Sequence, residues 1–98
     1  FSLIKIELAP SIISIGNNAF DGCISLKKIL IPSSVISIGS YAFYRCLSLE
    51  TIKILSLSIS IGELAFDKCL SLNQITVSSS VNLNLTGIDL KKIKLNKI

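Results

Sequence analysis

Short stretches of alternating apolar and polar residues recur along the chain. Each has the form L-x-x-I-x-I, and Leu or Val replaces the last Ile in some of them. The stretches occupy residues 2–8, 25–31, 48–54, 71–77 and 89–95. Successive side chains of a strand point to opposite faces, so this alternation predicts five half-buried β-strands.

The segments between these strands follow a common order. Each strand is followed by a turn rich in Ser or Pro, and then by a second short extended piece at residues 12–15, 35–38 and 59–61. A Gly comes next, where we expect a positive φ or a close backbone approach. The motif A-F-x-x-C closes the unit. Its spacing at Ala42, Phe43 and Cys46 predicts a short helical or 3₁₀ turn with one apolar side.

The whole unit repeats with a single, unvarying period. Three sets of equivalent residues show the period: Gly16, Gly39 and Gly62; Phe20, Phe43 and Phe66; Cys23, Cys46 and Cys69. A fixed period of this length is typical of a solenoid, in which stacked coils bury a continuous core. We therefore predict one α/β solenoid domain over residues 1–98, with about four 23-residue coils. A parallel β-sheet forms one face, and short strands with helical or 3₁₀ turns form the other.

The coil boundaries follow from the period. They are a partial coil 1–14, repeats 15–37, 38–60 and 61–83, and a degenerate C-terminal coil 84–98. The chain begins without Met and midway through a coil, so we expect it to be part of a longer protein. In repeat 38–60 Ser58 stands where Val35 stands in the repeat before it, and we expect Leu57 to take the buried position instead. After Val81 the A-F-x-x-C motif is missing, and the last strand stretch begins at position 89, earlier than the period would place it.

The stretch from Cys23 to Phe43, CISLKKILIPSSVISIGSYAF, resembles the repeat of the BspA-type leucine-rich repeat family, close to CxSLxxIxIPxSVxxIGxxAF. The resemblance covers residues 1–80 well and the last coil only weakly. It implies a curved leucine-rich-repeat solenoid that binds proteins, often in adhesion, and that is located at the cell surface or secreted. A cytoplasmic location is the alternative. The resemblance carries over no catalytic residue.

Composition also argues against two classes of function, a membrane-spanning protein and a nucleic-acid-binding protein. Half of the residues are apolar, but no run reaches the roughly 18 apolar residues of a membrane span. Residues 81–98 are basic, with four Lys against Asp89. No aromatic residues are interleaved with these lysines, so we expect no nucleic-acid partner. A basic, solvated end of the chain is the simpler interpretation.

Candidate chemistry is sparse. The three cysteines lie one full repeat apart and the chain has no His, so they do not form the close pairs of a zinc site. A disulfide between adjacent coils remains open, but buried free thiols are the simpler interpretation. Without His the usual general base is absent, and we expect no enzyme, no cofactor and no metal site. Asn84-Leu85-Thr86 is a possible N-glycosylation sequence.

The outward side of the strands is the predicted binding surface for a protein ligand. In each strand the residues that flank the central Ile point outward. They are Lys5, Glu7, Lys28, Leu30, Thr51, Lys53, Gln74, Thr76, Lys92 and Lys94. Tyr41 and Tyr44, near the predicted helical turn, offer contacts on the opposite side. The alternative function is assembly, in which the end coils stack on neighbouring chains.

Overall fold

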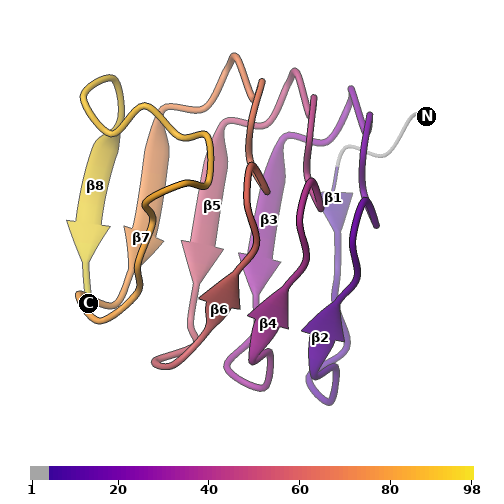
Figure 1. The fold of residues 1–98 in the computed structure, drawn as a ribbon, viewed down its shortest axis with the longest axis vertical. Helices are drawn as coiled ribbons and strands as arrows, with labels where there is room; N and C mark the ends of the chain where they lie inside the picture. The colour runs from indigo at the N-terminus through magenta and orange to yellow at the C-terminus, as the bar shows by residue number, and fades with distance from the viewer. Residues whose placement is uncertain (1–4) are drawn as a thin grey trace.

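The computed structural model describes residues 5–98, which form a solenoid with a parallel sheet along one side (Figure 1). This sheet has five strands in the order β1, β3, β5, β7 and β8. Their bounds are Lys5–Ile6 for β1, Lys28–Ile31 for β3, Thr51–Ile54 for β5, Gln74–Val77 for β7 and Lys94–Lys97 for β8. Each coil therefore adds one strand beside the strand of the coil before it.

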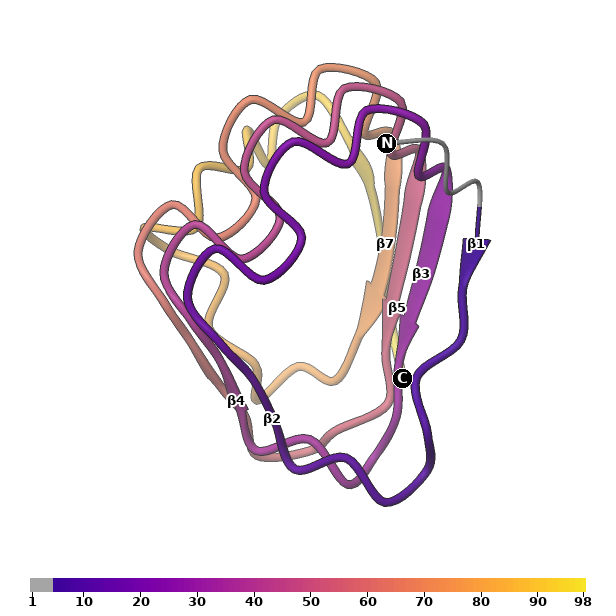
Figure 2. The same cartoon turned by 90° about the vertical axis from the view of Figure 1, so that its right-hand side faces the viewer.

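A second, narrower sheet lies on the other side of the coil, as the view along the solenoid shows (Figure 2). It contains β2 (Ser14–Ile15), β4 (Ser37–Ile38) and β6 (Ser60–Ile61), in that order and also parallel. These strands fall within the second extended pieces that the sequence predicts. Residues 1–4, which begin the first predicted strand, lie outside the described residues.

The repeat period sets the register of the first four strands of the large sheet. Ile6 pairs with Ile29, Ile29 with Ile52, and Ile52 with Ile75. Equivalent residues of successive coils therefore lie side by side, about 4.8 Å apart. The predicted solenoid, its parallel sheet and these ladders are confirmed.

The core is a set of apolar ladders between the two sheets. Phe43 and Phe66 are fully buried, and Phe20, Phe43 and Phe66 form a stack with 5.2 Å between successive ring centroids. The rings are nearly parallel, at 16° and 5°. Strict repetition places each ring over the same position of the next coil, so the stack follows directly from the period.

The predicted helical turn is absent: residues 5–98 contain no α-helix or 3₁₀-helix. The reason lies in two backbone positions of each coil that have positive φ, which interrupts a right-handed helix. Asn18, Tyr41 and Leu64 occupy the first position, and Gly22, Arg45 and Lys68 occupy the second. Alternate backbone N–H groups of this segment bond to the next coil, as Phe20 N–H does to the carbonyl of Ala42 at 2.7 Å, and the N–H groups on either side of Phe20 bond within their own coil. The segment is a series of turns bonded between coils.

The last strand is two positions later than the sequence predicts. Lys94, and not Lys92, pairs with Gln74, so the final interval is longer than predicted but still shorter than the regular period. A turn at residues 89–92 uses the additional residues: Lys92 N–H donates to the carbonyl of Asp89 at 3.0 Å, and Lys91 N–H donates to the Asp89 carboxylate at 3.1 Å. The alternating pattern fits both registers, so it could not distinguish them.

The expected burial of Leu57 is also wrong, because its side chain is 70% exposed. Ser56 is buried in its place, and its hydroxyl lies 2.7 Å from the carbonyl oxygen of Val35 and 3.0 Å from that of Pro32. A buried hydroxyl is tolerated where it forms hydrogen bonds. The carbonyl groups of the turn at residues 32–35 therefore favour burial of Ser56 over burial of Leu57 in the next coil.

Close approach explains the repeated glycines. A Cβ atom on Gly39 would lie 2.5 Å from the backbone nitrogen of Asn17, and one on Gly62 would lie 2.6 Å from the carbonyl carbon of Gly39. Neither residue has positive φ. Gly16, which has no preceding coil against it in the described residues, has open space at the same position.

Candidate binding surface

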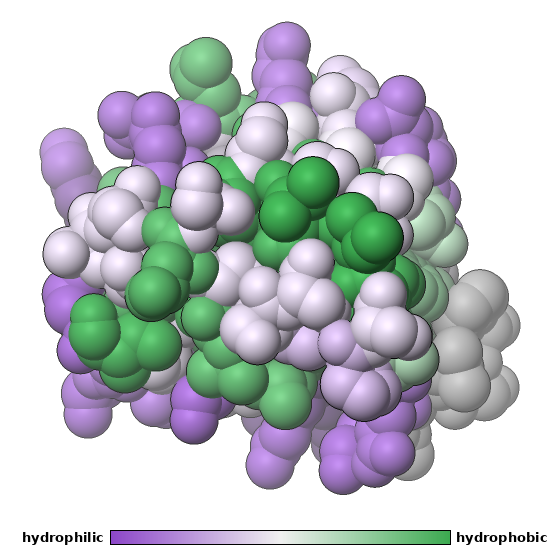
Figure 3. Space-filling model, turned by 90° about the horizontal axis from the view of Figure 1, so that it is seen from below, coloured by the Kyte–Doolittle hydropathy of each residue, from purple (hydrophilic) through white to green (hydrophobic). Residues whose placement is uncertain are grey.

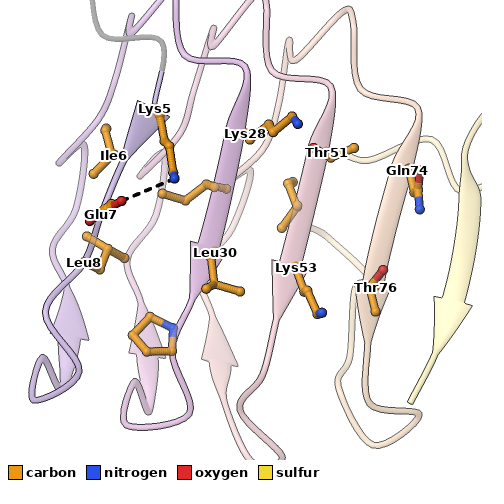
Figure 4. A pocket seen from close by; sticks show the side chains of 13 residues that line it. Lys5, Ile6, Glu7, Leu8, Lys28, Leu30, Thr51, Lys53, Gln74 and Thr76 are labelled. Carbon is orange, nitrogen blue, oxygen red and sulfur yellow. Dashed lines mark ion pairs between the residues drawn. The ribbon is translucent and has the colours of Figure 1, made fainter.

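The outward residues of four strands line a shallow depression of about 600 Å³ on the large sheet (Figure 4). The alternation within each strand turns its isoleucines inward and leaves the flanking side chains outside. Eight of the ten residues that the sequence predicts line this depression. They are Lys5, Glu7, Lys28, Leu30, Thr51, Lys53, Gln74 and Thr76.

One wall of the depression is β1. In the view along the solenoid, β1 stands out from β3, β5 and β7 towards solvent (Figure 2). Half-buried Ile6 of β1 and half-buried Leu8, which follows this strand, line the depression, together with Pro32 directly after β3. Sequence reasoning missed these three residues. Ile6 and Leu8 occupy positions that are buried in the next coil, and nothing in the pattern indicates that β1 stands out.

The charge of the depression is mainly positive. Lys5 forms an ion pair with Glu7, with 3.2 Å between Nζ and Oε1. Lys28 and Lys53 also line the depression, and within residues 5–98 neither forms an ion pair. The lining therefore presents two lysines whose charge no neighbouring carboxylate offsets.

The remaining two predicted residues do not line the depression. Lys94 is in β8, beside Gln74, and is exposed. Lys92 lies in the turn before β8, with its Nζ 4.0 Å from a carboxylate oxygen of Asp89. Asn96 pairs with Thr76 in the place expected for Lys94, and its amide nitrogen lies 3.5 Å from the Thr76 hydroxyl. The shifted register of the last strand accounts for all three positions.

The cysteines are free and belong to the packing between coils. Cys23 and Cys46 are buried and Cys69 is half-buried. The Cys46 thiol lies 3.3 Å from the carbonyl oxygen of Phe20, and the Cys69 thiol lies 3.2 Å from that of Phe43. Burial is the main cause of the raised pKa of Cys23. The hydrogen bond to the Cys69 side chain and then burial raise the pKa of Cys46. Raised pKa values keep these two thiols protonated and poorly nucleophilic.

Apolar side chains are also exposed away from the depression. Seen from below, the turns that join the two sheets carry several apolar groups among polar ones (Figure 3). Ile13 and Ile36 are each 60% exposed, and Leu57 is 70% exposed. Tyr41 and Tyr44 pack edge to face, with ring centroids 5.3 Å apart. These residues offer contact area, but none of them lines the depression on the large sheet.

Other candidate sites have little support in the described residues. Asn84 is exposed, whereas the Thr86 of its sequence triplet is fully buried and donates to the carbonyl of Leu83 at 2.6 Å. Within residues 5–98, no three His, Cys, Asp or Glu side chains gather as metal ligands. No helix in this part of the chain is long and apolar enough to cross a membrane.

A family model described as "BspA type Leucine rich repeat region (6 copies)" matches residues 1–97. The chain belongs to the BspA-type leucine-rich repeat family. Leucine-rich repeats are generally protein-interaction modules, and those of BspA type are generally extracellular or surface-associated. No curated protein matches the chain.

One solved structure supports the fold of this BspA-type chain. It is a leucine-rich repeat protein from Bacteroides ovatus ATCC 8483, with a TM-score of 0.80 and 31% sequence identity. The similar region covers 94% of this chain and 24% of the Bacteroides protein. The chain therefore spans about a quarter of the length of that protein.

Proposed function

We propose that the chain is a non-enzymatic protein-binding module that contacts its partner through the outer face of the large sheet. The depression on that face supports the proposal, because four successive coils build it mainly from outward side chains that are not part of the core. Solenoids commonly bind partners on such extended surfaces. A role in adhesion at the cell surface, as part of a longer array of repeats, is the setting that the family favours.

Photo-crosslinking tests this function. A photoreactive amino acid replaces Lys53 in the depression, and in a matched variant it replaces Lys68, which is exposed in the turn after Phe66. We expect a saturable protein adduct from position 53 that excess unlabelled chain displaces, and none from position 68. Equal adducts at both positions, or no adduct at position 53 with any protein from the native surroundings, would contradict the proposal.

A second function, assembly by stacking of end coils, has one observation in its favour. In the part of the chain that the structure describes, the surface beside Gly16 has open space where Gly39 and Gly62 meet the backbone of the preceding coil. Ala19 is exposed and Phe20 is half-buried, whereas Ala42, Ala65, Phe43 and Phe66 are buried. A second copy that stacks on this surface as a neighbouring coil does would approach Gly16 as closely as the preceding coil approaches Gly39.

The variant Gly16→Ala separates the two functions. Its added Cβ atom meets nothing within residues 5–98, but it would clash in a stack that reproduces the junctions at Gly39 and Gly62. Assembly predicts an oligomer in light scattering that Gly16→Ala converts to a monomer. A chain that is monomeric at all concentrations excludes stacking of this kind.

A further inference from the structure

We propose that the depression binds an extended peptide segment in which carboxylates lie beside one large apolar side chain. This inference rests on the proposed function, protein binding by the large sheet, and it names the chemistry of the partner. The residues that decide it are Lys28, Leu30 and Lys53, which are neighbours on β3 and β5.

The charges favour an acidic partner. Lys28 and Lys53 have no carboxylate within ion-pair distance in the described residues, while Lys5 is already paired with Glu7. Lys28 and Lys5 lie opposite each other in the register, about 5 Å apart at the backbone, so their side chains extend from the same face of the sheet. Carboxylates of a ligand would add negative charge to this positive surface and pair with Lys28 and Lys53. Complementary charge of this kind mainly determines which partner is accepted.

The apolar part of the lining favours a peptide with an apolar anchor. Leu30 is 48% exposed and lies between the two lysines, two positions after Lys28 on β3 and directly opposite Lys53 on β5. Leu8 and Pro32 continue this apolar area to the edge of the depression. A large apolar side chain placed here would remove Leu30 from water while the adjacent lysines hold carboxylates on either side.

The rest of the lining suits a peptide backbone better than a nucleic acid. Thr51, Gln74 and Thr76 supply uncharged donors and acceptors along the depression, as the backbone of an extended segment requires. Within residues 5–98 no aromatic side chain lines it, so these residues offer no platform on which bases could stack.

The test is a titration of the isotope-labelled chain, followed by backbone amide NMR. The probe is the blocked peptide Gly-Asp-Gly-Leu-Gly-Asp-Gly at physiological salt, because alternate residues of an extended segment share one face. Its three counterparts have Asn in place of Asp, Lys in place of Asp, or Ser in place of Leu. We expect saturable shifts around Leu30 and Lys53 with the acidic peptide. The Asn peptide should bind about tenfold more weakly, because two exposed ion pairs are lost. The Ser peptide should bind about fivefold more weakly.

Variants of the chain test the same residues. Lys28→Glu with Lys53→Glu should weaken binding of the acidic peptide about tenfold or more, while it strengthens binding of the Lys peptide. The control is Lys91→Glu with Lys92→Glu, which changes net charge equally outside the depression and should alter affinity less than about twofold. Leu30→Ser should weaken binding about fivefold, whereas Leu70→Ser, at an exposed leucine elsewhere, should not. The amide spectrum of each variant reports whether it is folded.

The outcomes separate this inference from the function on which it rests. If the Asn peptide binds the depression as well as the acidic one, the surface binds peptides but the assigned chemistry is wrong. If the acidic peptide shifts no amide around Leu30 and Lys53, the inference fails, and photo-crosslinking at position 53 still decides the protein-binding function. Tighter binding of a single-stranded oligothymidylate with equal negative charge would assign the lysines to nucleic acid and overturn the proposal.

Discussion

Gly39 and Gly62 lie where neighbouring coils approach most closely, so at these positions a single methyl group affects the whole stack. We expect Gly39→Ala to lower the free energy of unfolding by about 2 kcal/mol or more, because the backbone atoms that its Cβ would meet cannot move aside cheaply. Gly16→Ala, with open space and no positive φ, should leave stability unchanged or raise it by about 0.5 kcal/mol. Urea unfolding measures both. Equal losses in the two variants would show that close approach is not the reason for these glycines.

Lys68 has a φ of 61°, at the position where Gly22 stands two coils earlier. A side chain in this left-handed conformation costs roughly 1–2 kcal/mol. The Lys68 side chain is exposed, so little packing is lost on its removal. We expect Lys68→Gly to raise the free energy of unfolding by about 1 kcal/mol. The control Lys68→Ala keeps the unfavourable φ and should bring no gain, and a gain of the same size in both variants would contradict the explanation.

At the scale of single elements, the turn between β5 and β6 depends on Ser56. Ser56→Ala removes a buried hydroxyl, so the carbonyl groups of Pro32 and Val35 lose this hydrogen-bond donor. The loss should lower the free energy of unfolding by about 1–2 kcal/mol. Leu57→Ser changes an exposed residue and should have an effect within about 0.5 kcal/mol. Chemical unfolding of the two variants checks this order. The reverse order would restore the expectation that Leu57 is the buried residue.

The elements that could be predicted are those that the period repeats without change. The inward isoleucines of β3, β5 and β7 follow from alternation and spacing alone, and so do the outward residues of the depression. The register of β8 could not be predicted, because the last coil differs in length from the others and the pattern fits a strand at either position. The short helical or 3₁₀ turn predicted from Ala42, Phe43 and Cys46 is wrong, because apolar spacing does not reveal the positive φ of Tyr41 and Arg45. The shape of the depression depends on where β1 stands, and this is a property of the assembled coils.

At the scale of the whole molecule, each described coil is held mainly by its immediate neighbours. In such an arrangement, stability is approximately a sum of coil and junction contributions. Two of the variants above act through junctions: Gly39→Ala weakens one directly, and Ser56→Ala weakens the contact between coils 15–37 and 38–60. The Lys28 and Lys53 changes alter only the outer face, so binding and stability can be varied independently.

The stacked phenylalanines and the tyrosine pair also give the chain two intrinsic spectroscopic signals. The chain has no Trp, and its two Tyr residues both lie in coil 38–60, whereas Phe20, Phe43 and Phe66 span three coils. Tyrosine fluorescence thus follows one coil, and the fine structure of the phenylalanine circular dichroism follows the core across three. We expect the two signals to change together on heating, because a chain this short should unfold cooperatively. Two separate transitions would instead show that the coils unfold one after another, and no added label is needed to observe this.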